Sequence, residues 1–263
     1  MFTPWIKTPT SRRNADAKDR PPVFLAIDFE KLDNITKDSD LNAENQVGLA
    51  IFDPKNLNSS VLNPNRLIPT FNFASGSLKY CSTVSRKFLF GISKTIKREE
   101  MLTSINSLIP SASSIILVGH HIATDLQALR ALDFDFRPVI AVLDTLRIGH
   151  EVLQQTGSLR DLLIKLECPF NMLHCAGNDA HFTLRVLLLL AAASTNDLAH
   201  SQLQRDLRRL GHAPIPLRVD PHTKASRKKE KRLQKSRKHQ SRSWSIEKQD
   251  TIRAEQAARR SKV

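Results

Sequence analysis

The sequence predicts an α/β domain in which helices cover a mixed β-sheet. Two observations lead to this fold class. Apolar runs of strand length come early and helical apolar spacing comes late, with alternation between the two in the middle of the chain. The 263 residues are 40% hydrophobic, which is enough for one domain with a sizeable core plus appendages. No internal repeat is evident.

Five strands are expected from short apolar runs that end at turn-forming or polar residues. They are expected at 23–28, 46–53, within 66–73, at 114–119 and at 138–144.

Helices are expected where apolar residues recur every three or four positions, and a basic, irregular stretch separates the third strand from the first helix. They are expected at 97–109 up to Pro110, at 123–132, after Asp144, at 158–166, at 177–194 and at 197–211. Asp144 is expected to cap the helix that follows it, and Gly211 to end the last one. Because 177–194 is apolar all round, that helix should be buried.

Positive charge gathers in the C-terminal part of the chain. The formal net charge is +14, of which residues 214–263 carry +11 and residues 1–213 carry +3. We therefore divide the chain into a leader (1–22), a domain (23–212) and a basic tail (213–263). The tail has little to bury, so we expect it to be disordered when free, or helical without packing partners.

The densest basic cluster in the tail has two functional interpretations. It would serve as a phosphate-binding arm for nucleic acid, or as a nuclear localisation signal. A third interpretation is a solvated tail with no partner. A helix there would be basic all round, which leaves no apolar side for a membrane. The cluster comprises Arg227, Lys228, Lys229, Lys231 and Arg232.

Cysteine content and apolar run length indicate an intracellular location, in the nucleus or the cytoplasm, and the basic tail favours the nucleus. Three cysteines without paired spacing are not a disulfide framework, which fits a reducing compartment. The N-terminal residues lack the apolar core of a signal peptide, and the longest apolar run, 186–193, is too short to cross a bilayer.

Acidic residues occur at the ends of the expected elements. Asp28 and Glu30 end the first strand on one face, where two carboxylates repel each other unless a cation lies between them. Asp125 and Asp179 each open a helix, and His174 precedes Asp179 by five positions. Each residue alone has a simpler explanation, as a solvated loop acid, a first-turn acid that favours the helix dipole, or a loop histidine. Their order within one domain favours a common site.

Three blocks carry a family resemblance: FLAIDFE, VGHHIATDL and HCAGNDAHFTL. Over roughly residues 22–195 the chain resembles the DEDDh group of 3′–5′ exonucleases on the RNase H-like fold, and most nearly a fungal branch of such proteins. The resemblance implies an RNase H-like mixed sheet flanked by helices. It also implies that His174 is the catalytic base and that the metal ligands are Asp28, Glu30, Asp125 and Asp179.

The activity implied by the resemblance is hydrolysis of single-stranded RNA or DNA with two divalent ions, Mg²⁺ or Mn²⁺. Carboxylates suit these ions, and two ions about 3.5–4 Å apart can stabilise both the attacking and the leaving oxygen. Phe29 or His121 would help to form the slot for the terminal nucleotide, although a strand would turn Phe29 away from Asp28.

Three positions depart from the family pattern. Lys31 stands where many members have Thr, His121 where Asn is frequent, and Cys175 where Asn is common in the fungal branch. These departures motivate an alternative, a catalytically weak or inactive nucleic-acid-binding or adaptor protein in RNA handling or transport. A third alternative is a basic protein associated with ribosomes or chromatin, which would require the ordered set of acids to have arisen by chance.

A structural zinc site is a further alternative for part of the sequence. Cysteine and histidine residues lie close together in the sequence between the helices expected at 158–166 and 177–194 and in the first turns of the latter, but without the usual paired spacing. They are Cys168, His174, Cys175 and His181.

Overall fold

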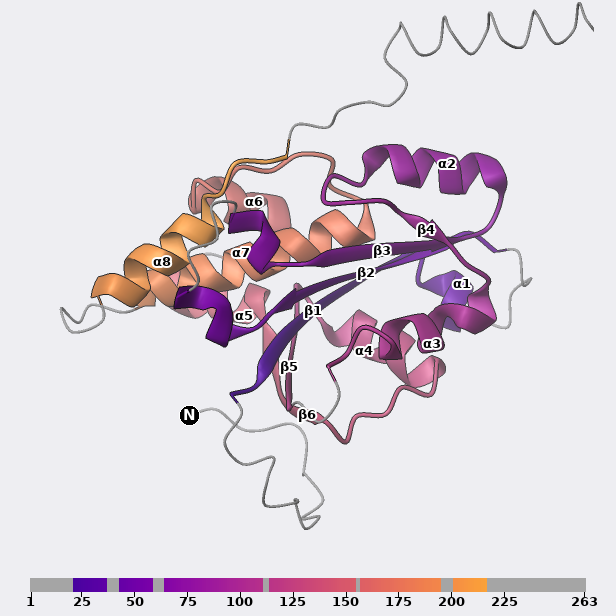
Figure 1. Cartoon of the computed structure of the whole chain (residues 1–263), viewed down its shortest axis with the longest axis horizontal. Coiled ribbons are helices and arrows are strands. Elements are labelled where there is room, and N and C mark those ends of the chain that lie inside the picture. Colours follow the sequence, from indigo (N-terminus) through magenta and orange to yellow (C-terminus); the bar gives the residue numbers. More distant parts are fainter. Residues whose placement is uncertain are drawn as a thin grey trace, which may run out of the picture. The chain divides into compact units, whose positions relative to one another are not determined.

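The computed structural model describes residues 21–36, 43–58, 64–110, 114–154, 157–194 and 201–216. These residues form a six-stranded sheet in the order β4-β3-β2-β1-β5-β6, with helices on both faces (Figure 1). The strands are β1 Val23–Glu30, β2 Asn45–Phe52, β3 Thr70–Ser75, β4 Lys94–Thr95, β5 Ile115–Gly119 and β6 Val139–Asp144.

The sheet is mixed, as the sequence predicts. β1 pairs with β2, and β2 with β3, in antiparallel fashion, whereas β5 is parallel to both β1 and β6, and β4 is parallel to β3. β1 extends through Glu30 rather than ending at Asp28. Both acids therefore lie within a paired strand, with Asp28 opposite Gly48 and Glu30 opposite Gln46.

Most expected helices are present. Asp144 caps α5, since its side chain accepts a hydrogen bond from the Leu146 N–H, and α8 ends at Gly211, as predicted. The helices are α1 Asp33–Thr36, α2 Leu78–Lys87, α3 Met101–Asn106, α4 Ala123–Ala131, α5 Thr145–Leu153, α6 Leu159–Lys165, α7 Ala176–Ser194 and α8 Ser201–Gly211, and short 3₁₀ helices are η2 Pro54–Asn58, η3 Pro64–Leu67 and η4 Arg98–Glu100.

Two expectations about the segment after β3 were wrong. The stretch predicted to be irregular contains α2 and β4. Ser77 caps α2 by accepting the Tyr80 N–H, and Cys81 and Val84 bury one side of the helix while its basic residues stay outside. The helix expected at 97–109 is shorter, because its first turn is the 3₁₀ helix η4 and α3 ends at Asn106.

The alternation of β1 divides its side chains between two cores. Leu25, Ile27 and Phe29 join the larger core, which also takes in residues of α3 and α4. Ala26 faces the other way, into the core beneath α7. Because successive side chains alternate across a strand, Asp28 and Glu30 continue the row of Ala26 and lie on the α7 side of the sheet.

α7 is buried along almost its whole length, as its apolar sequence predicts, and it lies across β1, β2 and β3. Its N-terminus rests directly on β2 at Gly48. A Cβ atom at that position would lie 2.0 Å from the Ala176 carbonyl carbon and 2.2 Å from the Gly177 nitrogen. Only glycine permits this approach, which brings the first turn of α7 over the acidic end of β1.

Arg185, in the middle of α7, is fully buried and is held by acceptors from distant parts of the chain. Its guanidinium donates to the Ala213 carbonyl (2.8 Å), to the Asn65 side chain and to His181 Nε2 (3.1 Å). Since His181 Nε2 accepts, Nδ1 carries the proton and donates to Thr70 Oγ1 at 2.7 Å. This network joins α7, η3 and the segment after α8.

Within the described residues, no helix has both the length and the apolar character needed to cross a bilayer.

Replacing Gly48 by Ala should destabilise the protein by about 2 kcal/mol or more, because the added methyl group meets backbone atoms that cannot move independently. Urea unfolding followed by circular dichroism measures the change. Gly91→Ala is the control, since a Cβ there would lie 3.3 Å from one ring atom of Phe88. Equal effects of the two substitutions would contradict the close approach of α7 to β2.

Candidate active site

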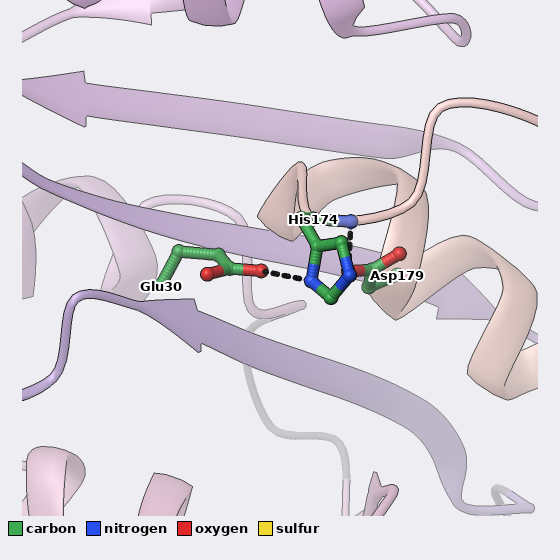
Figure 2. A group of neighbouring side chains, drawn as sticks. All are labelled: Glu30, His174 and Asp179. Atoms are coloured by element: carbon green, nitrogen blue, oxygen red, sulfur yellow. Dashed lines mark hydrogen bonds and ion pairs between the residues drawn. The ribbon is translucent and has the colours of Figure 1, made fainter. Parts of the chain in front are cut away.

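Three side chains, from the end of β1, from the loop before α7 and from the first turn of α7, meet beside the C-terminal end of β1 (Figure 2). One ligand atom each from Glu30, His174 and Asp179 lies within 4.8 Å of the others. His174 Nδ1 is 3.7 Å from Glu30 Oε1. Residues that are far apart in the sequence thus form a compact acidic and imidazole group.

The backbone fixes the loop that carries His174, while its side chain remains exposed. The His174 N–H donates to Asp179 Oδ2 at 2.9 Å, and the residue has a φ of 62°, which non-glycine residues seldom adopt. The imidazole is 81% exposed. Asp179 therefore has two functions, since it holds the loop with one oxygen and leaves the other for the site.

Asp125, in the first turn of α4, is buried against β1. Its Oδ1 accepts the backbone N–H of Phe29 at 3.0 Å. Because Phe29 lies between Asp28 and Glu30, this bond brings the carboxyl of α4 to the acidic end of β1. The three segments that carry the predicted acids thus converge.

Burial and mutual repulsion perturb these carboxyls strongly. Burial, and then repulsion by Asp179, Asp125 and Glu30, raises the pKa of Asp28 well above its usual value. Burial is also the main cause that raises the pKa of Asp125 and of Asp179 to about 7, although each accepts a backbone hydrogen bond that opposes the rise. Nearby Glu30 adds to both shifts. The acids therefore behave as one charged cluster.

The donor set fits divalent cations. Asp28 Oδ2 and Asp179 Oδ1 are buried, and neither accepts a hydrogen bond from a residue that the structure describes. A buried carboxylate oxygen without a partner is costly, and a cation between the acids would remove both this cost and the repulsion. Carboxylate oxygens are the ligands that Mg²⁺ and Mn²⁺ prefer. The residues that would hold such ions are Asp28, Glu30, Asp125 and Asp179.

The residues of the zinc alternative do not gather. Cys168 Sγ donates to the Gly211 carbonyl, and His181 lies buried between Thr70 and Arg185. Among the described residues, His174 shares its potential metal group with Glu30 and Asp179 rather than with a cysteine. This arrangement favours oxygen ligands over a cysteine–histidine zinc site.

Residues 23–190 match a family model, DEDDh_C, described as DNA polymerase III subunit epsilon-like, C-terminal domain. The chain belongs to the DEDDh exonuclease family. The match runs from the start of β1 into α7 and so includes every acid and the histidine of the site. The mixed sheet flanked by helices is the RNase H-like fold of this family, whose members generally use divalent metal ions.

A similar protein occurs in yeast. The chain is 28% identical over 201 residues to the uncharacterized protein YDR514C of Saccharomyces cerevisiae. The alignment covers 64% of this chain and 41% of the yeast protein, so this DEDDh chain spans about two fifths of that protein's length. The likeness to a fungal protein agrees with the fungal branch indicated by the sequence.

The two residues proposed for a nucleotide slot lie in different surroundings. His121 is exposed, with a φ of 58°, and its N–H donates to Asp144 Oδ1 at 2.8 Å. The Phe29 side chain is 9% exposed and packs in the core on the face opposite Asp28 and Glu30. Packing in the core therefore explains the position of Phe29 better than a role in binding the terminal nucleotide. The basic cluster of the tail, from Arg227 to Arg232, lies outside the described residues.

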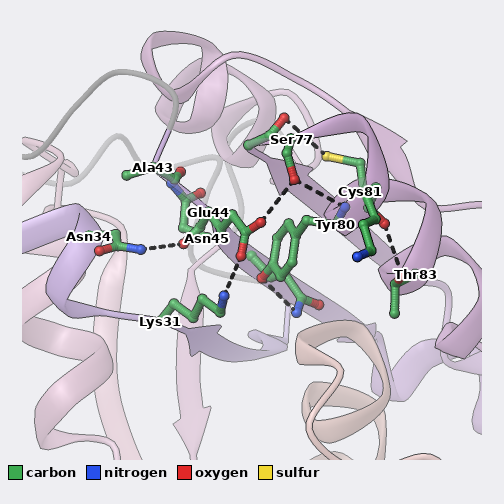
Figure 3. Close-up of polar contacts among 12 residues, drawn as sticks. Lys31, Asn34, Ala43, Glu44, Asn45, Ser77, Tyr80, Cys81 and Thr83 are labelled. Carbon is green, nitrogen blue, oxygen red and sulfur yellow. Dashed lines mark hydrogen bonds and ion pairs between the residues drawn. The ribbon is translucent and has the colours of Figure 1, made fainter.

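The departures at Lys31 and Cys175 have distinct settings. Lys31 pairs with Glu44 and lies over the Tyr80 ring, 4.5 Å from its centroid (Figure 3). Cys175 is buried, and burial raises the pKa of its thiol to about 12. This thiol is therefore unsuited to react as a thiolate.

Sequence reasoning missed the polar residues that position the start of α7. Asn72 Oδ1 accepts the Gly177 N–H at 2.8 Å, and Gln46 Oε1 accepts the Ala176 N–H at 3.4 Å. Asn178 donates to the carbonyls of Lys87 (2.9 Å) and Met172 (2.8 Å). They provide partners for backbone groups at a helix end. The only signal for Asn178 in the sequence was its position next to Asp179, and no sequence pattern indicated Asn72 or Gln46.

Without metal, we expect the protein to lose stability as pH rises from about 4 to about 7. The buried acids have folded-state pKa values above their unfolded values near 3.8, so the folded state binds more protons in this window. Asp28→Asn should therefore raise stability at pH 8, by on the order of 1 kcal/mol. Thermal unfolding in EDTA at pH 5 and pH 8 measures this effect.

The matched control is Asp133→Asn, which changes an exposed carboxyl just after α4. Added Mg²⁺ or Mn²⁺ should stabilise the wild-type protein at pH 8 and stabilise Asp28→Asn less. If the metal stabilises the wild-type protein and Asp28→Asn equally, Asp28 is not a metal ligand.

Proposed function

We propose that this protein is a 3′–5′ exonuclease that hydrolyses phosphodiester bonds of single-stranded RNA or DNA with two Mg²⁺ or Mn²⁺ ions. One observation carries the proposal: Glu30, His174 and Asp179 converge where Asp28 and Asp179 each have a buried carboxylate oxygen without a partner. Family membership supports the nuclease class.

The residues of the chain have separate roles in this proposal. The four acids hold the ions, which supply charge stabilisation for the attacking and leaving oxygens. The exposed imidazole of His174 takes the proton of the attacking water, acting as a general base. Glu30 orients that ring through Nδ1, and Asp179 fixes the loop through the His174 N–H.

The basic tail has two proposed roles. Its charge would hold the polymer near the domain through phosphate contacts, which gives affinity that falls with salt and does not depend on sequence. The same cluster would direct the protein to the nucleus. Both roles are motivated by the excess of 11 positive charges in residues 214–263.

A second candidate function is favoured by the setting of Lys31. This residue follows Glu30 directly, where many family members have Thr, and it is bound to Glu44 and Tyr80 at the edge of the site. If that substitution impairs substrate placement, the protein would bind nucleic acid with little or no cleavage and would act as an adaptor in RNA handling or transport.

Purified full-length protein with 5′-labelled single-stranded RNA and DNA distinguishes the two functions. We expect a ladder that shortens from the 3′ end with Mg²⁺ or Mn²⁺ and disappears with EDTA. The Asp28→Ala/Glu30→Ala protein should show no ladder, and His174→Ala should be slower by about 10²–10⁴-fold, the usual contribution of a general base.

His150→Ala and Asp133→Asn are the controls, since both change exposed residues that the proposed reaction does not use. Cleavage that survives loss of Asp28 and Glu30 would refute the exonuclease proposal. Binding without a ladder from the wild-type protein would establish the adaptor instead.

A further inference from the structure

The charge of the proposed site raises the question of how a polyanion approaches it. Four acids and two divalent ions together are neutral, but each phosphate of the polymer adds one negative charge. Cations beside the acids would therefore help the polymer to approach. Two described cations lie on segments that contact the loop of His174 or the first turn of α7: Lys87, the last residue of α2, and Arg160, in the first turn of α6.

Lys87 is fixed against the first turn of α7. Its carbonyl accepts from Asn178 Nδ2 at 2.9 Å, and Asn178 Oδ1 accepts the Leu89 N–H at 2.9 Å. The end of α2 is therefore clamped beside the residue that precedes Asp179.

Arg160, in α6, lies beside the loop that leads to His174. Its guanidinium lies 5.4 Å from the centroid of the Phe170 ring, and Phe170 belongs to the loop that leads to His174. A cation over an aromatic face is held in place without losing its charge.

Neither cation is neutralised by a described carboxylate. Among the described residues, no acid forms an ion pair within 4.0 Å with Lys87 or with Arg160, whereas Lys31 is paired with Glu44. Arg160 is exposed and Lys87 is half-buried, so both are accessible to a ligand. Two positive charges thus border the acids and remain available for phosphate groups.

We infer that Lys87 and Arg160 bind phosphate groups of the polymer on its way into the acid site and position its 3′ end. The inference rests on the proposed function and names the residues that hold the substrate there. They act as positioning residues, because their cationic groups contact the polymer backbone rather than the bond that is broken.

Binding is measured with full-length Asp28→Asn/Glu30→Gln protein, which retains the polymer uncleaved, and a fluorescent single-stranded oligonucleotide at several salt concentrations. Lys87→Gln and Arg160→Gln should each weaken binding about 3–10-fold at 0.1 M salt. Each should also reduce the slope of log K against log salt by about 0.7, the value for one phosphate contact on a single strand. The basic tail is present in every variant, so its contribution to affinity and to the salt slope is the same in all of them and does not affect the comparison.

Neighbouring cations of the same helices provide matched controls. Arg86→Gln alters a side chain that bonds to Ser82 and Thr83, and Lys165→Gln alters the exposed last residue of α6. Both should leave affinity and slope near the parent values. Lys87→Arg and Arg160→Lys should restore the slope, which separates loss of charge from misfolding.

Cleavage by the otherwise wild-type protein gives the second readout. Lys87→Gln and Arg160→Gln should raise KM more than they lower kcat. If the Lys87→Gln and Arg160→Gln proteins match their controls in both the salt slope of binding and KM, while the wild-type protein cleaves, the inference is wrong and the proposed function stands. If the wild-type protein neither cleaves nor binds single strands, the proposed function fails and the inference fails with it.

Discussion

The direct contact between the N-terminus of α7 and β2 at Gly48 is the constraint on which the site depends. Asp28 and Glu30 lie on β1, beside β2, and they face α7 because of the pleat of the strand. A side chain at Gly48 would push α7 away and take Asp179 and the His174 loop with it. The absence of one side chain therefore brings together residues that are between 144 and 151 positions apart in the sequence.

The stability of the domain and the chemistry of the site oppose each other. Three carboxyls with raised pKa values, from β1, α4 and α7, gather at one end of β1, and two of their oxygens are buried without a partner among the described residues. Such a cluster makes the metal-free domain less stable at neutral pH. The surrounding cores and the hydrogen bonds at the start of α7 supply the stability that tolerates this repulsion. The same buried acids thus account for both the proposed affinity for metal ions and the expected instability without them.

The sequence predicts the parts of the fold that have regular patterns. Apolar runs located β1, β5 and β6, and the unbroken apolar character of residues 177–194 gave both the position and the burial of α7. α2 was missed because only Cys81 and Val84 mark its buried side, and basic residues conceal that spacing. Asn72 and Gln46 could not be foreseen, since they act across more than 100 residues through contacts that only the folded chain creates.

The buried guanidinium of Arg185 has a practical consequence for work with shortened versions of this chain. One of its acceptors is the carbonyl of Ala213, which lies at the junction where the composition turns basic. A protein that ends at residue 212 would keep the buried positive charge of Arg185 but lose the Ala213 carbonyl that accepts from it. Part of the buried guanidinium would then have no hydrogen-bond acceptor, which is costly. Removing the basic residues without harming the fold therefore requires a cut beyond Ala213, and Pro216 is the last described residue that such a version should keep.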